Sequence, residues 1–166
     1  TRPEVDSSQI CALIGNDLPL LTAAIRSGVT HLVATPGFLH NTLDRCGQTG
    51  EYPHEEINEL LRADPGLRDP IANTMAYYDP ACFADAIRAS ALLWGDAGSL
   101  DPLVQQLNGP TEVRPSEYSR YKDGLGEATW ISTQFGLDEV VVPAALALTV
   151  SPLHFSEAFP RHSQDS

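Results

Sequence analysis

Apolar residues in this chain form several short runs that predict a parallel sheet. Residues 30–35 and 90–94 are mainly apolar and are bounded by glycine or proline, so each run predicts a buried strand. Residues 111–114 predict an edge strand, and a further strand is expected near Val5. Because helical segments separate these runs, the pattern predicts an α/β fold with a mostly parallel sheet.

Helically spaced apolar residues connect the predicted strands. Residues 12–27 follow this spacing, and Pro19 places the helix start just before it, with Asp17 as the cap and Gly28 as the stop. Residues 53–63 begin with proline, carry acidic residues in the first turn and end near arginine, which is typical of a helix. Further helices are predicted at residues 70–78, directly after Asp79-Pro80, at 102–107 and at 126–135.

The C-terminal part of the sequence differs in character from the rest. Residues 139–150 contain two apolar runs on either side of Pro143, and the last residues are polar. No repeat is visible, and no linker rich in Pro, Gly or Ser divides the chain. We therefore expect a main domain at residues 1–137 and a divergent tail at 138–166 that packs on the sheet or extends it.

Composition and charge narrow the function classes. The 166 residues include 10 basic and 22 acidic side chains, which gives a formal charge of −12. Nucleic acids and anionic membranes are bound by clustered Lys and Arg, so we expect neither as a partner. No apolar run reaches the roughly 18 residues of a membrane span, and no signal segment is visible, so we expect a soluble, cytoplasmic protein.

The sequence contains no motif for a metal or a cofactor. Cys11, Cys46 and Cys82 are widely spaced, without the paired cysteines of a structural zinc site. They are interpreted as three reduced thiols or as one disulfide with a spare thiol. Carboxylates at calcium-loop spacing and glycine-rich nucleotide motifs are both absent. We expect no metal and no cofactor.

The segment Val5-Asp6-Ser7-Ser8-Gln9 carries a candidate nucleophile. In α/β-hydrolases a serine occupies a sharp strand-to-helix turn within the pattern G-x-S-x-G. Ser8 precedes a predicted helix, but Asp6 and Ile10 stand where the pattern has glycine. Taken alone, this segment is better explained as a polar turn that caps a helix.

A longer series of segments resembles the acetyl-xylan esterase and cephalosporin-C deacetylase family. The series covers residues 5–122, about 70% of the chain. The family's order begins with a Ser-Gln turn, a strand ending in Pro-Phe-Leu and a Tyr-x-Glu-Ile helix. It continues with a Tyr-Phe-Asp segment, a Gly-Asp turn and a Gly-Pro-Lys-Glu strand, and this sequence follows the same order. The matching segments are Ser8-Gln9, Pro36-Gly37-Phe38-Leu39, Tyr52-Pro53-His54-Glu55-Glu56-Ile57, Tyr77-Tyr78-Asp79-Pro80, Gly95-Asp96 and Asn108-Gly109-Pro110-Thr111-Glu112-Val113.

The resemblance implies a partial or remodelled α/β-hydrolase fold and a set of site residues. Ser8 falls on the nucleophile, and the backbone N–H of Gln9 on an oxyanion-hole donor. The acid position coincides with Gly98, so Asp96 or Asp101 on the same turn is expected to serve instead.

The remaining site roles carry over less directly. The family's histidine position, near residues 118–124, holds no histidine. Among the possible replacements His40, His54, His154 and His162, His154 is the best in chain order. Tyr78 is a candidate for stacking on a sugar substrate. The expected substrate is a small acetylated ester or sugar.

The length of the chain leaves two kinds of function open. Only seven residues precede Ser8, whereas the family has several strands before its nucleophile. We therefore expect the C-terminal half of the fold. It is either a truncated half of a longer protein, a half completed by a second copy or another chain, or a remodelled domain whose own tail covers the open edge. The resemblance implies either an acetyl-ester hydrolase that uses Ser8 or an inactive homologue that serves as an interaction or small-ligand-binding subunit.

Overall fold

The structure is a computed structural model that describes residues 12–117, 120–137 and 140. The chain divides into two compact units, Thr1–Tyr118 and Ser119–Ser166, and each is described by itself. The predicted tail at 138–166 falls almost wholly outside the described residues, so the predicted boundary at residue 137 stays a prediction.

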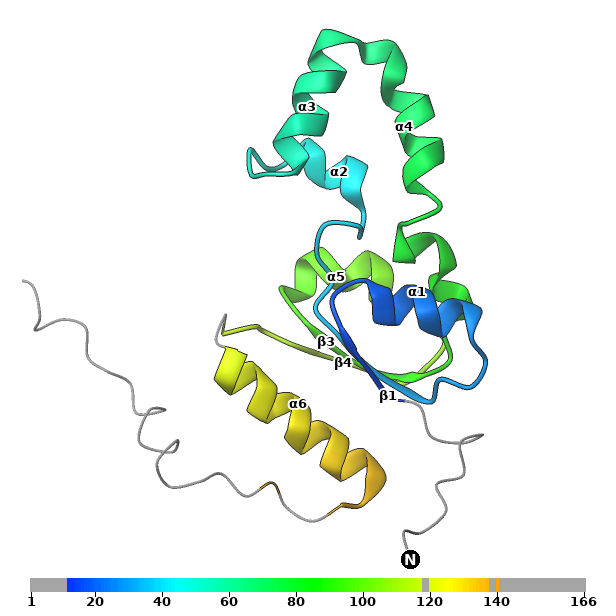
Figure 1. The fold of residues 1–166 in the computed structure, drawn as a ribbon, viewed down its shortest axis with the longest axis vertical. Helices are drawn as coiled ribbons and strands as arrows, with labels where there is room; N and C mark the ends of the chain where they lie inside the picture. The colour runs from blue at the N-terminus through cyan, green and yellow to red at the C-terminus, as the bar shows by residue number, and fades with distance from the viewer. Residues whose placement is uncertain (1–11, 118–119, 138–139, 141–166) are drawn as a thin grey trace, which may run out of the picture. The chain divides into compact units, whose positions relative to one another are not determined.

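The first unit is built on a four-stranded parallel sheet. The strands lie in the order β1-β2-β3-β4, so each pairs with the next along the chain (Figure 1). Their bounds are Ala12–Gly15, His31–Ala34, Ser90–Trp94 and Thr111–Arg114. Parallel neighbours require crossover connections, and helices supply them here. The predicted α/β class with a mostly parallel sheet is confirmed.

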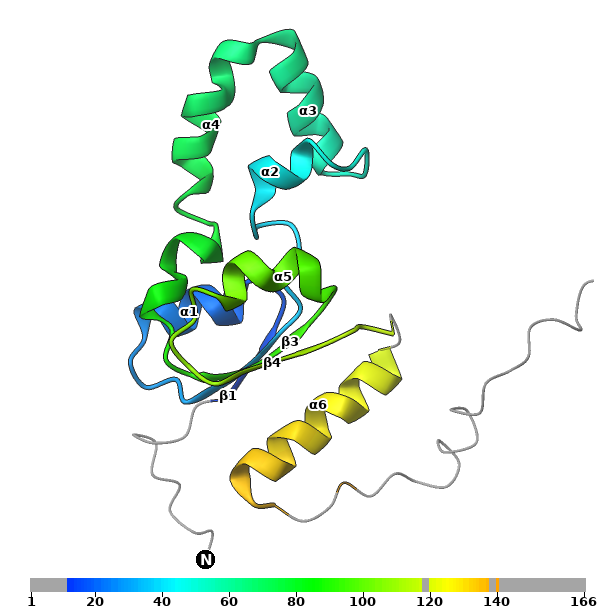
Figure 2. The same ribbon diagram turned by 180° about the vertical axis from the view of Figure 1, so that it is seen from behind.

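One face of the sheet carries the hydrophobic core. Helix α1 (Leu18–Ile25) and helix α5 (Ala97–Val104) lie over this face in both views (Figures 1 and 2). The 3₁₀ segment η2 (Pro80–Ala86) packs against α1. The buried core side chains of these elements include Leu20, Leu32, Ile87, Leu93 and Leu103.

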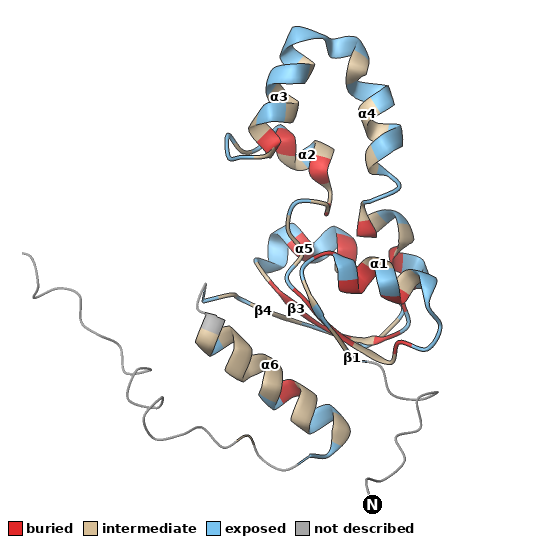
Figure 3. Ribbon diagram, viewed as in Figure 1, coloured by how far each residue is buried: buried red, intermediate tan, exposed pale blue. Residues whose placement is uncertain are grey.

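A helical excursion separates β2 from β3. It consists of α2 (Thr42–Cys46), α3 (His54–Ala63), η1 (Pro65–Leu67) and α4 (Arg68–Met75). Figure 3 colours most of α3 and α4 as exposed or intermediate, and α4 has no buried residue. Within α3 only His54 is buried. The excursion is therefore held mainly by its two ends rather than by a core of its own.

The second unit contains one described helix, α6 (Arg120–Phe135). Gly136 follows it with φ of +59°, a left-handed conformation that favours glycine and commonly ends a helix. Among the described residues, no helix is both long and apolar enough to cross a membrane.

Several predicted elements differ from the observed ones in extent. The helix predicted to start just before Pro19, with Asp17 as its cap residue, is confirmed as Leu18–Ile25, while residues 12–15, which share the helical spacing of the same run, form β1. The run of apolar residues fits both periodicities, and pairing with β2 decides for the strand. The helix expected after Asp79-Pro80 is a 3₁₀ segment, and α5 begins at Ala97 rather than at Pro102.

Candidate functional site

A cavity lies at the carboxyl ends of β2, β3 and β4. In open parallel sheets this edge is where ligands bind, because the loops that follow the strands converge there. The cavity has a volume of about 340 Å³. We call it the carboxyl-edge cavity. Residues on its walls include His40, Arg45, Glu51, Trp94, Asp96 and Ser99.

Trp94 reaches this cavity because it is the last residue of β3. Its side chain is only 6% exposed. The guanidinium carbon of Arg114 lies 5.9 Å from the ring centroid, within the range of a cation–π contact. The buried indole Nε1 has no hydrogen-bond partner among the described residues. An unsatisfied buried N–H is costly, so this donor calls for an explanation.

His40 contributes the complementary atom. The side chain is 2% exposed, and its Nε2 lies 3.4 Å from the backbone oxygen of Ser99. A carbonyl oxygen can only accept, so this contact requires the hydrogen on Nε2. Nδ1 then carries the lone pair in the neutral ring, and it too lacks a partner among the described residues. Two residues that line the cavity therefore each have one buried ring nitrogen without a partner in the described part of the chain.

Asp96 also lines the cavity, and it has a structural role as well. Its Oδ2 accepts a hydrogen bond from the backbone N–H of Ser99 at 2.9 Å, which caps α5. The Ser99 hydroxyl donates to the backbone oxygen of Asp96 at 2.9 Å. One oxygen of the carboxylate is thus engaged at the helix N-terminus, where a negative charge is favourable.

Asp17 stands at the strand-to-helix turn of this unit. The turn Gly15-Asn16-Asp17 joins β1 to α1, and Asp17 is 6% exposed. Its two carboxylate oxygens accept hydrogen bonds from the backbone N–H groups of Gly37 at 3.0 Å and Leu39 at 3.3 Å. Asp17 therefore fastens the loop after β2, which carries His40, to the start of α1.

Asp79 secures the other end of the same loop. Its carboxylate accepts from the backbone N–H of Asn41 at 2.9 Å and of Ala81 at 2.8 Å. Burial raises the pKa of Asp79, while its two backbone hydrogen bonds and nearby His40 act to lower the pKa, and Asp17 acts to raise it. Two carboxylates thus hold the loop on both sides of His40.

The comparisons with known proteins decide the fold family. No protein-family model and no curated protein matches the chain. Among solved structures, an acetyl xylan esterase from Paenibacillus sp. R4 superposes with a TM-score of 0.67 and 24% identity over 80% of this chain. Acetyl xylan esterase 1 from Thermoanaerobacterium sp. JW/SL YS485 gives a TM-score of 0.59 and 18% identity over 76%. The chain has the fold of acetyl xylan esterases.

The chain spans about half the length of these two structures, 47% and 46% of them. The family resemblance found in the sequence is confirmed at the level of the fold. Whether the chain is the C-terminal half, and whether its catalytic residues are degenerate, stay predictions.

The structure describes only some of the predicted site residues. Ser8, Gln9 and His154 lie outside the described residues. Asp96 lines the carboxyl-edge cavity, whereas Asp101 is exposed in the middle of α5 and is not part of its wall. Tyr78 is 54% exposed just beyond α4 and also lies outside the wall of that cavity. The assignments themselves stay predictions.

Sequence reasoning identified Asp17 as a helix cap but missed the strand before it, and therefore missed that Asp17 lies at a strand-to-helix turn. In an acetyl-xylan-esterase-like α/β fold, the nucleophile belongs to a strand-to-helix turn, and the described turn carries Asp17 rather than serine. Along the sequence, β1 at Ala12–Gly15 comes between Ser8 and the helix predicted to start just before Pro19. The signal was present in the sequence, because Gly15-Asn16-Asp17 divides an apolar run from a segment containing Pro19.

Metal binding has no support in the described part of the chain. No group of three or more His, Cys, Asp or Glu side chains is close enough together there to hold an ion.

Proposed function

We propose that the carboxyl-edge cavity binds a small acetylated ester or acetylated sugar. The observation that carries this proposal is the pair of unused buried atoms, the Trp94 Nε1–H donor and the His40 Nδ1 acceptor. An ester carbonyl accepts a hydrogen bond, and a neighbouring sugar hydroxyl donates one. These two atoms, in residues that line the cavity, therefore match a hydroxylated ester better than a purely apolar ligand.

The size and composition of the cavity support the same ligand class. Its volume of about 340 Å³ lies within the range of small-molecule sites, roughly 300–1,000 Å³. The Trp94 indole adds an aromatic surface, which suits the apolar face of a sugar ring. Acetyl xylan esterases of the same fold are named for an acetylated sugar polymer.

Two substitutions test the donor and the acceptor separately. Trp94→Phe removes the N–H and keeps an aromatic ring, while His40→Gln retains a donor near Nε2 and removes the Nδ1 acceptor. Calorimetric titration with a monoacetylated methyl xyloside is expected to show roughly 2–10-fold weaker binding for each variant, the value of one neutral hydrogen bond. Trp130→Phe, on the second unit, serves as the matched control.

The outcome for the parent sugar is equally informative. Methyl xyloside without the acetyl group should bind more weakly to the unmodified protein, because it lacks the carbonyl acceptor. Equal affinity for both sugars, together with unchanged binding in both cavity variants, would contradict the proposed site.

The shared fold with acetyl xylan esterases favours hydrolysis as a second candidate function. In this proposal the Ser8 hydroxyl attacks the ester carbonyl and His154 takes its proton, with Asp96 or Asp101 orienting the imidazole. The alcohol leaves with that proton, and the acetyl group remains on Ser8. Water then releases acetate and restores the hydroxyl.

Hydrolysis of p-nitrophenyl acetate tests this mechanism. Ser8→Ala should lower the rate by two or more powers of ten, whereas the neighbouring Ser7→Ala should not change it. Asp96→Asn and Asp101→Asn then identify the acid, and His154→Ala the base. Background hydrolysis that is the same in the parent protein and in Ser8→Ala would exclude Ser8 as the nucleophile.

The position of Asp17 favours a function that does not include hydrolysis. Both of its oxygens already accept backbone hydrogen bonds, and no serine occupies the described strand-to-helix turn. On this view the chain is a catalytically inactive homologue that binds its ligand or partner. Binding of the acetylated xyloside without release of acetate, with Ser8→Ala binding equally well, is the expected result.

A further inference from the structure

A second cavity lies in the helical excursion. It has a volume of about 510 Å³, and no residue lines both cavities. We call it the α2–α3 cavity. Side chains on its walls include Leu43, Cys46, Asn58, Leu61, Arg62 and Arg68.

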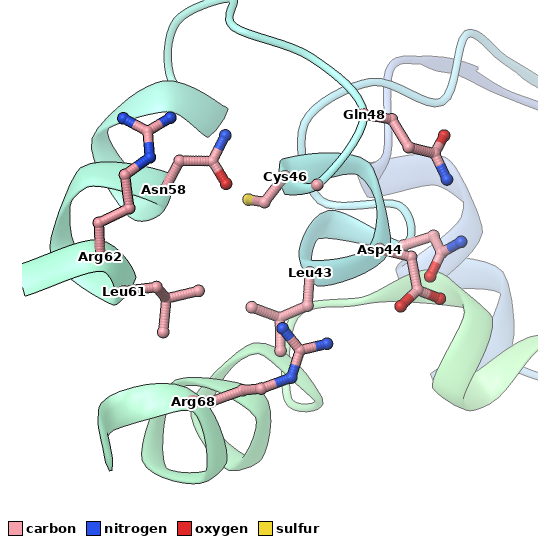
Figure 4. Close-up of a pocket in the computed structure, with 10 residues that line it drawn as sticks. Leu43, Asp44, Cys46, Gln48, Asn58, Leu61, Arg62 and Arg68 are labelled. Carbon is pink, nitrogen blue, oxygen red and sulfur yellow. The ribbon is translucent and has the colours of Figure 1, made fainter. Parts of the chain in front are cut away.

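The interior of the α2–α3 cavity is partly apolar. Figure 4 shows Leu43 on α2 and Leu61 on α3 pointing toward one another across it. The thiol of Cys46 also points into the gap, and this side chain is only 2% exposed. These three side chains leave space between them that a short aliphatic group can fill.

The charged groups at the cavity differ in whether they are neutralised. Arg62 forms an ion pair with Glu55 at 2.9 Å, and Asn58 donates to the other oxygen of Glu55 at 3.2 Å. Arg68 has no ion-pair partner among the described residues, and its guanidinium reaches toward Leu43 (Figure 4). Burial raises the pKa of Cys46, while the nearby charges of Arg45 and Arg68 act to lower it.

Acidic residues dominate the chain, yet they do not neutralise Arg68. The 22 acidic side chains outnumber the 10 basic ones, and Arg62 pairs with Glu55 and Arg114 with Glu112, whereas Arg68 has no such partner among the described residues. Asp44 is the acidic group on this cavity's wall, and it is exposed. A guanidinium beside an apolar gap matches a ligand with a carboxylate head and a short hydrocarbon tail.

We propose that the α2–α3 cavity binds a short aliphatic carboxylate, with its head on Arg68 and its tail between Leu43 and Leu61. This proposal is independent of the function proposed for the carboxyl-edge cavity, because it uses other residues. Asp44 opposes the ligand's charge and limits its affinity.

Octanoate is a suitable probe, with octanamide as its uncharged counterpart. Calorimetric titration of the whole chain should show saturable binding of octanoate at one site and at least tenfold weaker binding of octanamide. Methyl resonances of Leu43 and Leu61 should shift during the octanoate titration. This comparison uses the unmodified protein, so it does not depend on the folding of a variant.

Substitutions separate a binding role from a structural one. Arg68→Gln is expected to raise the octanoate Kd about tenfold, and Asp44→Asn to lower it, because it removes a like charge. Leu61→Ala should weaken binding as well. Arg88→Gln and Leu60→Ala, at exposed positions outside the cavity wall, are the controls and should leave the Kd unchanged.

Two results would overturn the proposal. The first is equal affinity for octanoate and octanamide, which would show that the charge of the head group does not matter. The second is an octanoate Kd that neither Arg68→Gln nor Asp44→Asn changes. Because the carboxyl-edge cavity contributes no residue to this site, Trp94→Phe should not affect octanoate binding.

Discussion

Individual carboxylates in this protein act mainly by holding backbone N–H groups. Asp17 and Asp79 each accept two backbone hydrogen bonds, of which all but the local one from Ala81 to Asp79 span long sequence separations, and both act on the loop around His40. A carboxylate that accepts from two backbone N–H groups holds them firmly, because hydrogen bonds to a charged acceptor are stronger than those to a neutral one. The position of His40 at the cavity depends on these two residues.

Replacement of Asp17 should therefore loosen this loop. In Asp17→Ala the N–H groups of Gly37 and Leu39 lose their acceptors, which is expected to cost about 1–3 kcal/mol of unfolding free energy. Asp85→Ala, at an exposed carboxylate, is the matched control. Urea denaturation measures both. If Asp17→Ala is as stable as Asp85→Ala, these hydrogen bonds contribute little to the unfolding free energy.

Gly109 is sensitive for a different reason, which is space. A Cβ at this position would lie 2.0 Å from the backbone oxygen of Ala89, and backbone atoms cannot yield as a flexible side chain does. We expect Gly109→Ala to lower the unfolding free energy by about 2 kcal/mol or more. Gly28 has nothing within 4 Å of a built Cβ, so Gly28→Ala should change stability far less. Thermal unfolding of the two variants is the measurement.

At the scale of elements, the helix ends and the loops after the strands determine which side chains reach the carboxyl-edge cavity. Helix α5 begins directly after β3 and brings Asp96 and Ser99 to the carboxyl-edge cavity. The same Asp96 side chain caps the helix and is a candidate catalytic acid. Its two roles respond differently to substitution.

Asp96→Asn and Asp96→Ala distinguish capping from catalysis. Asparagine caps helices nearly as well as aspartate, whereas alanine is expected to cost about 1 kcal/mol of stability. If Asp96 is the acid, both variants lose hydrolysis of p-nitrophenyl acetate, but only Asp96→Ala is less stable. Loss of stability in both would mean that the charge, rather than the hydrogen bond to Ser99, supports the helix.

His54, the first residue of α3, makes the unfolding free energy depend on pH. The ring is 5% exposed and meets the Phe38 ring edge-on, with centroids 5.4 Å apart. Burial is the main cause that lowers the pKa of His54, and the charge of Arg45 adds to it, while Glu51 acts to raise it. Protonation is therefore less favourable in the folded state than in the unfolded chain.

The sign of the pH effect follows from this lowered pKa. The contribution of His54 to stability is present above the unfolded pKa, about 6.5, and is lost as pH falls below it. His54→Gln should reduce the difference in unfolding free energy between pH 7.5 and pH 5.5. Denaturation curves at both pH values test this, and an unchanged difference would contradict it.

Some of these elements could be predicted from the sequence, whereas others and the site could not, and the reasons are physical. β2 and β3 were predictable because short apolar runs between glycine and proline have few alternatives. β1 was not, because the spacing of Leu13 and Leu20 also fits a helix, and only its partner strand decides. The cavity was not predictable as a unit, since His40 and Trp94 meet only through the sheet and the fastened loop.

At the scale of the whole molecule, the sheet has two outer strands. β1 and β4 each pair with a single neighbouring strand among the described residues. Outer strands expose N–H and C=O groups that can pair with another chain, and high net charge opposes such association. We propose that the tail at 138–166 covers or extends the sheet.

Two truncations test this role of the tail. Deletion of 138–166 should increase self-association in dynamic light scattering, whereas deletion of 151–166 retains the apolar runs and should not. The longer deletion removes four acidic residues and one arginine, so the formal charge changes only from −12 to about −9. Increased association would therefore reflect lost coverage rather than lost charge. Two equally monodisperse truncations would refute the proposed role.

The excursion between β2 and β3 also bears on the order in which the sheet assembles. Residues 16–30 connect β1 to β2 and residues 95–110 connect β3 to β4, whereas residues 35–89 separate β2 from β3. Closing a connection roughly fourfold longer costs about 1 kcal/mol more in chain entropy. Each outer pair can therefore form early around its own helix, α1 or α5. The central β2–β3 pairing, and the cavity that depends on it, forms late.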